Sequence, residues 1–493
     1  MKKQLAQRFM IWGLAALILA LGACTSVYAQ SEDKKRDVLD NRNMVIAKIV
    51  AGLSDADKKT VDEFLTAHFE RWNVEENEIY IPYYRADLQE LLKKVVNRKG
   101  KGYADAVGMI FAKLQGLSKS EVFIVRYNAL LMMGELDQSQ EAGAVAVPLA
   151  AARKELIAAL KDPKIEPASK IAILRGLVRH AGLEIKPEEK KELASFFDAY
   201  AFVEITAKTT DDILWMQELA LKGIGNAGDP GAKGERIAKL YEIITTPTER
   251  DMETEYKIKT DEKKNKPDEK SVRLVSRART AAALALASLK ADAKAFAAAK
   301  VAPLDAVKAI AGLAADALTT ECKRHYTLQK GRLSFNESRS GVARLGSQSG
   351  SEVQMDPQEN IEQIRSLRQR TKAVAEPFYT ALSPKKTNWD ALLTSAVDKK
   401  FCRDTYKAIA KIYELYDRTG FIKPKKDDKK PKKDPGETTK PQQDVLPPKE
   451  ITYNDLQEDL LGELRGLYEL LGRDKTPLTP QTTSNARASR GVR

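Results

Sequence analysis

The sequence has few of the features on which catalytic and cofactor sites depend. Its 493 residues include three cysteines and three histidines, and no paired-cysteine motif suits a haem or a structural zinc ion. It also lacks a glycine-rich phosphate loop, a zincin helix and a nucleophile elbow. We therefore nominate no catalytic, cofactor-binding or metal-binding residue, and we expect a protein that binds rather than catalyses, without a cofactor.

Long apolar runs are also scarce, because the chain has one and it lies near the N-terminus. Lys2, Lys3 and Arg8 precede an uncharged apolar stretch over residues 10–23. This stretch is too short for a permanent membrane span and is typical of a bacterial export signal. No other segment approaches the length of a span, which excludes a polytopic membrane protein. We predict that residues 1–29 direct export to the cell envelope.

Two processing sites overlap at the end of this signal. Residues 21–24 (LGAC) resemble the lipobox of bacterial lipoproteins, in which Cys24 would carry the lipid and become the mature N-terminus. Residues 27–29 (VYA) resemble an ordinary signal-peptidase site with cleavage after Ala29. The sequence leaves both open, so we expect a periplasmic protein or one held at the membrane through an N-terminal lipid alone.

Positive charge exceeds negative charge in this chain. There are 82 lysines and arginines against 69 acidic residues, for a formal net charge of +13. In a cell envelope this excess could favour anionic lipid head groups, wall polymers or acidic polysaccharide. The simpler interpretation is that lysines solvate helix surfaces. Export and the lack of a nucleic-acid fold motif argue against a nucleic-acid partner.

Two-residue alternation, the signal of strands, is almost missing. Residues 78–81 form the single plausible strand, and Pro82 ends it. Apolar residues instead recur at three- and four-residue steps, as in amphipathic helices. This helical pattern is clearest over residues 120–136, 144–160, 168–183, 211–226 and 272–289. An all-α fold is therefore expected, either a bundle or a helical solenoid.

Small residues recur in the middle of the chain at a spacing of 47. Ala129, Gly176 and Gly223 each precede an apolar residue, and a further copy fits at residues 280–289. Small residues at fixed helix positions let neighbouring helices approach closely. A unit of this kind buries its apolar stripe against the next copy.

This spacing, with the pattern of residues 125–130 and 216–229, resembles HEAT-like (armadillo-type) repeats. Their helix pairs recur about every 40–47 residues. The resemblance covers about residues 103–318 and implies an α-solenoid that presents an extended surface to a partner. An irregular helical bundle is the alternative.

The segments around the repeats differ in character. We expect an N-terminal helical region (30–102), a C-terminal helical region (319–421), a flexible basic Lys/Pro-rich linker (422–450), an amphipathic helix (451–472) and a basic tail (473–493). The C-terminal region is expected to contain a Ser/Gly-rich loop at 334–351 and helices at 357–382 and 388–416.

An aromatic cluster in the N-terminal region could face a ligand or pack in the core. Its members are Phe64, Phe69, Trp72, Tyr80, Tyr83 and Tyr84. His68 lies within it and is expected to be structural, as is His180 in a repeat helix.

Leucines follow one side of the C-terminal helix, at Leu456, Leu460, Leu464, Leu467 and Leu471. This row must be buried somewhere. It could fold back on the chain, pair with a second copy, or bind the groove of a partner protein.

Cys322 and Cys402 are the two cysteines beyond the signal region. In an oxidising compartment they could form a disulfide, or they could remain buried thiols. Cys322 and His325 lie one helical turn apart, but a metal site would need further ligands and we do not expect one.

The sequence thus favours an exported, non-catalytic scaffold that binds a protein of the cell envelope. One alternative is a helical enzyme acting on envelope polysaccharide through Asp/Glu acid–base chemistry. Such an enzyme would need two carboxylates about 5–10 Å apart, one with a raised pKa. Another alternative is a binder of anionic wall polymer or glycan.

Overall fold

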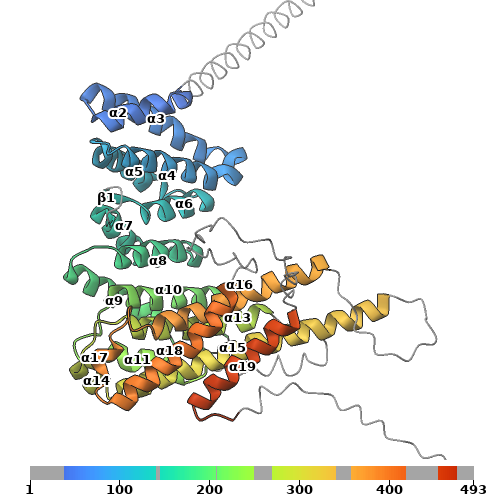
Figure 1. Cartoon of the computed structure of the whole chain (residues 1–493). Coiled ribbons are helices and arrows are strands. Elements are labelled where there is room, and N and C mark those ends of the chain that lie inside the picture. Colours follow the sequence, from blue (N-terminus) through green and yellow to red (C-terminus); the bar gives the residue numbers. More distant parts are fainter. Residues whose placement is uncertain are drawn as a thin grey trace, which may run out of the picture. The chain divides into compact units, whose positions relative to one another are not determined.

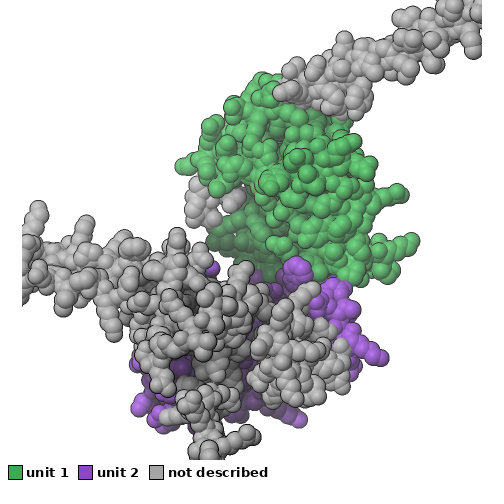
Figure 2. Space-filling view, turned by 90° about the vertical axis from the view of Figure 1, so that its right-hand side faces the viewer, with its two compact units in different colours: residues 1–193 green, residues 194–493 purple. Residues whose placement is uncertain are grey.

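Helices make up nearly all of the described chain, which confirms the all-α prediction (Figure 1). The computed structural model describes residues 38–139, 145–206, 208–248, 269–339, 357–417 and 453–474, with side chains left out at 269–276, 323–339, 357–368, 415–417 and 453–459. The chain divides into two compact units, residues 1–193 and 194–493, coloured separately in Figure 2. Each unit is described by itself.

Unit 1 is a succession of short and medium helices. They are α2 (Arg42–Ala51), α3 (Asp55–Glu70), the 3-10 helices η1 (Arg71–Asn73) and η2 (Glu75–Tyr80), α4 (Ile81–Asn97), α5 (Tyr103–Leu117), α6 (Phe123–Met133), α7 (Ala150–Leu160), α8 (Pro167–Gly182) and the first part of α9 (Pro187–Ala201).

Helices that are two elements apart in unit 1 pack against each other. α2 contacts α4, α4 contacts α6, and α6 contacts α8, while α3 contacts α5. Figure 1 shows these helices in successive layers along the chain. Each helix therefore buries its apolar side against the preceding and following layers, as an amphipathic pattern requires.

Two local predictions in unit 1 are wrong. Residues 78–81 form no strand, because 75–80 are the 3-10 helix η2 and Ile81 begins α4. Proline in the first turn of a helix has a favourable fixed φ, so Pro82 starts α4 instead of ending a strand. The helix expected from residue 144 begins at Ala150, after a small antiparallel pair of β1 (Asp137–Ser139) and β2 (Val147–Pro148).

Unit 2 contains the end of α9 and longer helices. They are α10 (Asp211–Ala227), α11 (Glu235–Thr245), α13 (Glu269–Ser288), α14 (Ala293–Ala298), α15 (Pro303–Arg339), α16 (Pro357–Ala381), α17 (Trp389–Leu392), α18 (Ala396–Asp417) and α19 (Tyr453–Leu470). α13 packs against α10 and α11, and α16 packs against α13, α15 and α18.

The helices predicted in unit 2 are present with small changes. Residues 334–339 of the expected Ser/Gly-rich loop belong to α15, and 340–351 lie outside the described residues. The helix expected over 388–416 is divided into α17 and α18. No helix among the described residues is long and apolar enough to cross a membrane.

The small residues that recur every 47 positions do lie at close helix approaches. In unit 1, a Cβ added to Gly176 would lie 2.7 Å from the Cα of Gly134. In unit 2, a Cβ added to Gly223 would lie 2.5 Å from the ring of Phe197. Ala129 is fully buried. The prediction that small residues allow close packing is confirmed at Gly176 and Gly223.

Candidate functional site

The aromatic cluster of the N-terminal region is split between the core and the surface of unit 1. Phe64, Phe69 and Trp72 are buried around the end of α3 and η1. Tyr80 and Tyr83 are 48% and 71% exposed. Core packing is therefore confirmed for Phe64, Phe69 and Trp72, and a ligand-facing role of the exposed tyrosines stays a prediction.

Exposed apolar side chains gather at the point where η2 leads into α4. Val74 and Ile79 are 43% and 71% exposed, in addition to the two tyrosines. Residues three and four positions apart on helical backbone are neighbours, so Ile79 and Tyr80 are each expected to lie next to Tyr83. We call this group, with the intervening glutamates, the Val74–Tyr83 surface.

The Val74–Tyr83 surface is acidic in a chain that is basic overall. Glu75 and Glu76 are exposed and Glu78 is half-exposed. These three make no ion pair with any residue that the structure describes. The surface thus combines exposed rings, an aliphatic side chain and uncompensated carboxylates, which is a combination suited to a basic partner.

A polar layer lies beneath this surface. The fully buried His68 ring donates from Nε2 to the Tyr84 carbonyl oxygen (3.1 Å) and accepts at Nδ1 from Arg71 Nη2 (2.7 Å). The Arg71 guanidinium lies 4.3 Å from the centre of the Tyr84 ring, a cation–π contact. The Tyr84 ring lies 6.4 Å from that of Tyr80. Of the two exposed tyrosines, Tyr80 therefore adjoins this polar layer through the Tyr84 ring.

Burial, and secondarily the charge of Arg71, lowers the pKa of His68 to about 3. A neutral ring with both nitrogens hydrogen-bonded holds the turn after α3 in place and has no proton to exchange near neutral pH. His180 is also fully buried, and burial followed by Arg179 lowers its pKa to about 3. Both histidines fit the structural role expected of them.

Two carboxylates that the sequence did not single out lie after α6. Burial raises the pKa of Glu135 and of Asp137, although nearby arginines oppose this. Glu135 accepts a hydrogen bond from Gln89, and both oxygens of Asp137 accept from Arg179 at 2.7 and 2.8 Å. Asp137 is only 4% exposed, so this pair of interactions joins α8 to the end of α6.

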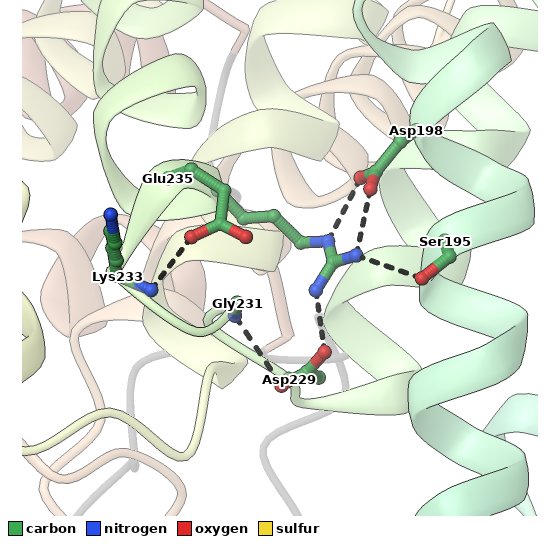
Figure 3. A network of polar contacts seen from close by, with 7 residues as sticks. Ser195, Asp198, Asp229, Gly231, Lys233 and Glu235 are labelled. Atoms are coloured by element: carbon green, nitrogen blue, oxygen red, sulfur yellow. Dashed lines mark hydrogen bonds and ion pairs between the residues drawn. The ribbon is translucent and has the colours of Figure 1, made fainter.

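A second buried ion-pair network lies in unit 2 (Figure 3). Arg236 of α11 donates to Asp198 of α9 at 2.7 and 2.8 Å and to Asp229 in the turn after α10 at 2.5 Å. Burial opposes the charge of Arg236, but the two aspartates outweigh it and raise its pKa. Asp229 also accepts from the amide of Gly231. The network fixes one turn between three helices.

Many polar pairs of unit 1 join residues separated by about one repeat. The separation is 40 to 47 residues in Arg42–Asp87, Gln89–Glu135, Thr66–Lys113, Gln115–Glu155, Arg126–Glu166 and Asp137–Arg179. It is 36 in Arg153–Glu189. Four of these seven pairs join opposite charges, and their spacing is a signal that the sequence could have revealed: Arg42–Asp87, Arg126–Glu166, Asp137–Arg179 and Arg153–Glu189.

Cys322 and Cys402 are two buried thiols that are not joined in a disulfide, so of the two alternatives the structure has the buried thiols. They lie on different helices, α15 and α18. Burial, followed by Asp390, raises the pKa of Cys402 to about 11, which makes this thiol unreactive. Within the described ranges, no three His, Cys, Asp or Glu side chains are grouped to hold a metal ion. The His325 side chain and Cys24 lie outside the described residues.

The leucine row of α19 is buried within unit 2. Leu460, Leu464 and Leu467 are fully buried, while Leu471 is half-exposed and the Leu456 side chain is not described. α19 packs against α15, α16 and α18 of the same unit. Of the three interpretations of this helix, the structure therefore corresponds to folding back, and these leucines are not available to a partner in this arrangement.

Polar contacts complete the docking of α19. The Tyr468 and Thr319 hydroxyls lie 3.0 Å apart in a buried position. After the helix, Arg473 donates to the Gly312 carbonyl oxygen and to Asp316 of α15. These contacts fix both the register and the end of α19.

Comparison with known proteins gave no relative from which a function could be transferred. No protein-family model matches the chain, and no match was found among curated proteins or solved structures.

Proposed function

We propose that this protein is an exported, non-catalytic scaffold that binds another protein of a bacterial cell envelope through the Val74–Tyr83 surface. The observation that carries this proposal is the exposure of Ile79 and Tyr83, each 71%. Exposed apolar residues on a rigid element, rimmed by charge, are typical of protein-binding surfaces.

The proposed architecture is a HEAT-like α-solenoid. Three features support it: polar pairs about one repeat apart, close approaches at Gly176 and Gly223, and packing of alternate helices in unit 1. A solenoid suits a scaffold because each repeat adds surface without requiring a closed core.

The proposal of export depends on residues 1–29, which lie outside the described residues. Mass spectrometry of the mature N-terminus tests it. A lipid-modified Cys24 would establish a membrane-held lipoprotein, and an unmodified start at residue 30 would establish soluble export. An intact Met1 in fractionated cells would contradict export.

The partner surface is assigned to unit 1 and not to α19. The expectation that α19 binds a partner would require Leu460, Leu464 and Leu467 to leave their own unit, which would expose three fully buried leucines. Each would lose roughly 2 kcal/mol of burial free energy.

Affinity capture from solubilised envelopes tests the scaffold function. The double variant Ile79→Ser/Tyr83→Ser should lose a protein that the unchanged chain retains. Val397→Ser is the matched control, because Val397 is 76% exposed at the start of α18 and lies far from this segment in sequence. Equal recovery by all three chains would contradict the proposed role of this surface.

An acid–base enzyme is the second candidate, since Glu135 and Asp137 both have raised pKa values. Against it, Asp137 is buried and both of its oxygens are held by Arg179. Hydrolysis of wall polysaccharide that disappears in Glu135→Gln would favour the enzyme. Binding of an anionic polymer at the Val74–Tyr83 surface is disfavoured by its three glutamates.

A further inference from the structure

We infer that unit 1 binds the anionic phospholipid head groups of a membrane surface through the turn between α4 and α5, residues 98–102. We call these residues the basic turn. It is separate in sequence from the Val74–Tyr83 surface, so the inference goes beyond the protein-binding role proposed above. The sequence predicted membrane contact through an N-terminal lipid alone, and the basic turn would add a second contact.

Positive charge without compensation is the first argument. Residues 91–104 contain five basic residues and no acidic one. Lys94 is half-exposed and the other four are exposed: Lys93, Arg98, Lys99 and Lys101. None of the five side chains has an ion-pair partner among the described residues. The next carboxylate along the chain, Asp105, lies 3.8 Å from the ammonium group of Lys58 instead.

The fixed backbone of the basic turn is the second argument. The Gly100 amide donates to the carbonyl oxygen of Val95 in α4 (3.0 Å), and the Gly102 amide donates to that of Ile49 in α2 (2.9 Å). A Cβ on Gly100 would lie 2.5 Å from the Val95 side chain, and one on Gly102 would lie 2.8 Å from the Ile49 oxygen. The backbone therefore lies tightly against two helices, and its cations need little ordering when they bind.

Local strain in favour of charge is the third argument. Lys99 has a φ of 54°, a left-handed conformation that glycine adopts at the end of a helix with less strain. Lys94 and Arg98 lie one helical turn apart, since the Arg98 amide donates to the Lys94 carbonyl oxygen (3.3 Å), and like charges at this spacing repel. Strain and repulsion that persist in adjacent residues point to a functional need for their charge.

Exposed cations on a turn suit an extended negative surface. Each lysine or arginine near an anionic bilayer strengthens the attraction about fivefold, within a Debye length of roughly 8 Å at physiological salt. The basic turn is bonded to α2, which begins at Arg42, close to the start of the described chain. A lipid on Cys24 would hold this part of the chain at a membrane. The choice of a lipid over another anionic surface therefore rests on the proposed export.

Sedimentation with vesicles tests the inference on the chain without its leader and without a lipid, residues 30–493. Vesicles of phosphatidylcholine are compared with vesicles of phosphatidylglycerol, which are anionic. We expect the protein to sediment with the anionic vesicles and not with the neutral ones. Binding should weaken several-fold as salt increases from about 0.05 to 0.5 M.

Two triple variants with the same change in charge give the decisive comparison. The test variant replaces the cations of the basic turn: Arg98→Gln/Lys99→Gln/Lys101→Gln. It should bind anionic vesicles at least about tenfold more weakly. The control variant replaces three exposed lysines elsewhere in unit 1: Lys119→Gln/Lys154→Gln/Lys164→Gln. It should bind within about twofold of the unchanged chain.

Lys99→Gly separates a binding role from a structural one. Glycine relieves the strain at this position, so urea denaturation should show an unchanged or higher free energy of unfolding. Vesicle binding should nevertheless weaken about fivefold, because one cation is lost. Lower stability with unchanged binding would mean that the cations only complement the C-terminal ends of α2 and α4, and would overturn the inference.

Equal weakening in both triple variants would also overturn it, because general charge attraction would then explain the binding. So would retention on dextran sulfate without binding to phosphatidylglycerol vesicles, since the ligand would then be an acidic polysaccharide. The proposed function has separate readouts. A chain that captures an envelope protein but does not bind anionic vesicles refutes only this inference. A chain that binds the vesicles as expected but loses no protein in Ile79→Ser/Tyr83→Ser refutes only the proposed scaffold surface.

Discussion

Gly134, just after α6, and Gly176 of α8 approach so closely that neither has room for a side chain. A Cβ on Gly176 would lie 2.7 Å from the Cα of Gly134 and 3.1 Å from Leu156. Gly176→Ala should therefore force α6 and α8 apart and lower the free energy of unfolding by about 1–3 kcal/mol. Urea denaturation of the purified chain measures this change.

Gly108→Ala is the matched control for this prediction. Gly108 lies within α5, and a Cβ there would meet nothing within 4 Å. Alanine favours a helix interior over glycine by about 1 kcal/mol, so this variant should be neutral or more stable. An unchanged stability for Gly176→Ala would contradict the close packing of these helices.

Stability should fall as pH decreases from about 6.5, because His68 and His180 are buried as neutral rings. Their folded pKa values, about 3, lie below the ordinary value of 6.5. The unfolded chain takes up protons below pH 6.5 and the folded chain does not. The contribution of each buried neutral histidine to the free energy of unfolding is therefore complete above pH 6.5. It is lost progressively toward pH 3, by up to about 1.4 kcal/mol per pH unit for each histidine.

Urea denaturation at pH 7.5 and pH 5.5 tests this dependence in a range above the titration of ordinary carboxylates. His180→Gln should be less stable at pH 7.5. The difference in its free energy of unfolding between pH 7.5 and pH 5.5 should be about half of that of the unchanged chain. A difference that is the same in the variant would show that His180 is not buried in the neutral form.

Asp137→Asn should destabilise unit 1, because it leaves the guanidinium of Arg179 without its carboxylate. Asp137 is 4% exposed and both of its oxygens accept from Arg179. Loss of one partner of a buried charged pair costs about 3–5 kcal/mol at most, and less where water reaches the other partner.

A double-mutant cycle with Arg179→Leu separates this interaction from other effects of the substitutions. The double variant should be more stable than the sum of the two single changes predicts, by about 1–3 kcal/mol. Simple additivity would contradict a direct pair between α8 and the turn after α6.

Leu464→Ala should loosen α19, because Leu464 is fully buried against the neighbouring helices of unit 2. Truncation of a buried leucine costs about 2–5 kcal/mol. The variant should be cleaved by protease in residues 453–470 faster than the unchanged chain. Leu470→Ala is the control in the same helix, since Leu470 is 38% exposed, and its cleavage rate should not change. Equal cleavage of both variants would argue against the docked position of α19.

Local sequence predicted most helices well. The acidic pair Asp211 and Asp212 begins α10, and Gly228 ends it with a φ of 70°, a backbone conformation that glycine adopts easily. α8 and α16 also begin within a residue of the predicted positions, and α19 begins within two. These boundaries follow from residues that are close in the chain, so no distant contact is needed to set them.

The sequence predicted the location of the candidate site but not which of its residues are exposed. The spacing of the aromatic residues identified the cluster but could not separate Trp72, which is fully buried, from Tyr83, which is exposed. The strand expected at 78–81 would also have placed alternate residues on opposite faces. The structure instead has the 3-10 helix η2 leading directly into α4, with Ile79, Tyr80 and Tyr83 all exposed.

The helical character of this chain and most helix boundaries follow from its residue pattern, because helix formation depends on residues within a few positions of one another. The pairing of Asp137 with Arg179, the lack of a disulfide between Cys322 and Cys402, and the packing of α19 on its own unit became visible only in the folded chain. These contacts join residues far apart in the chain, and an amphipathic pattern shows that a face will be buried without showing what will cover it.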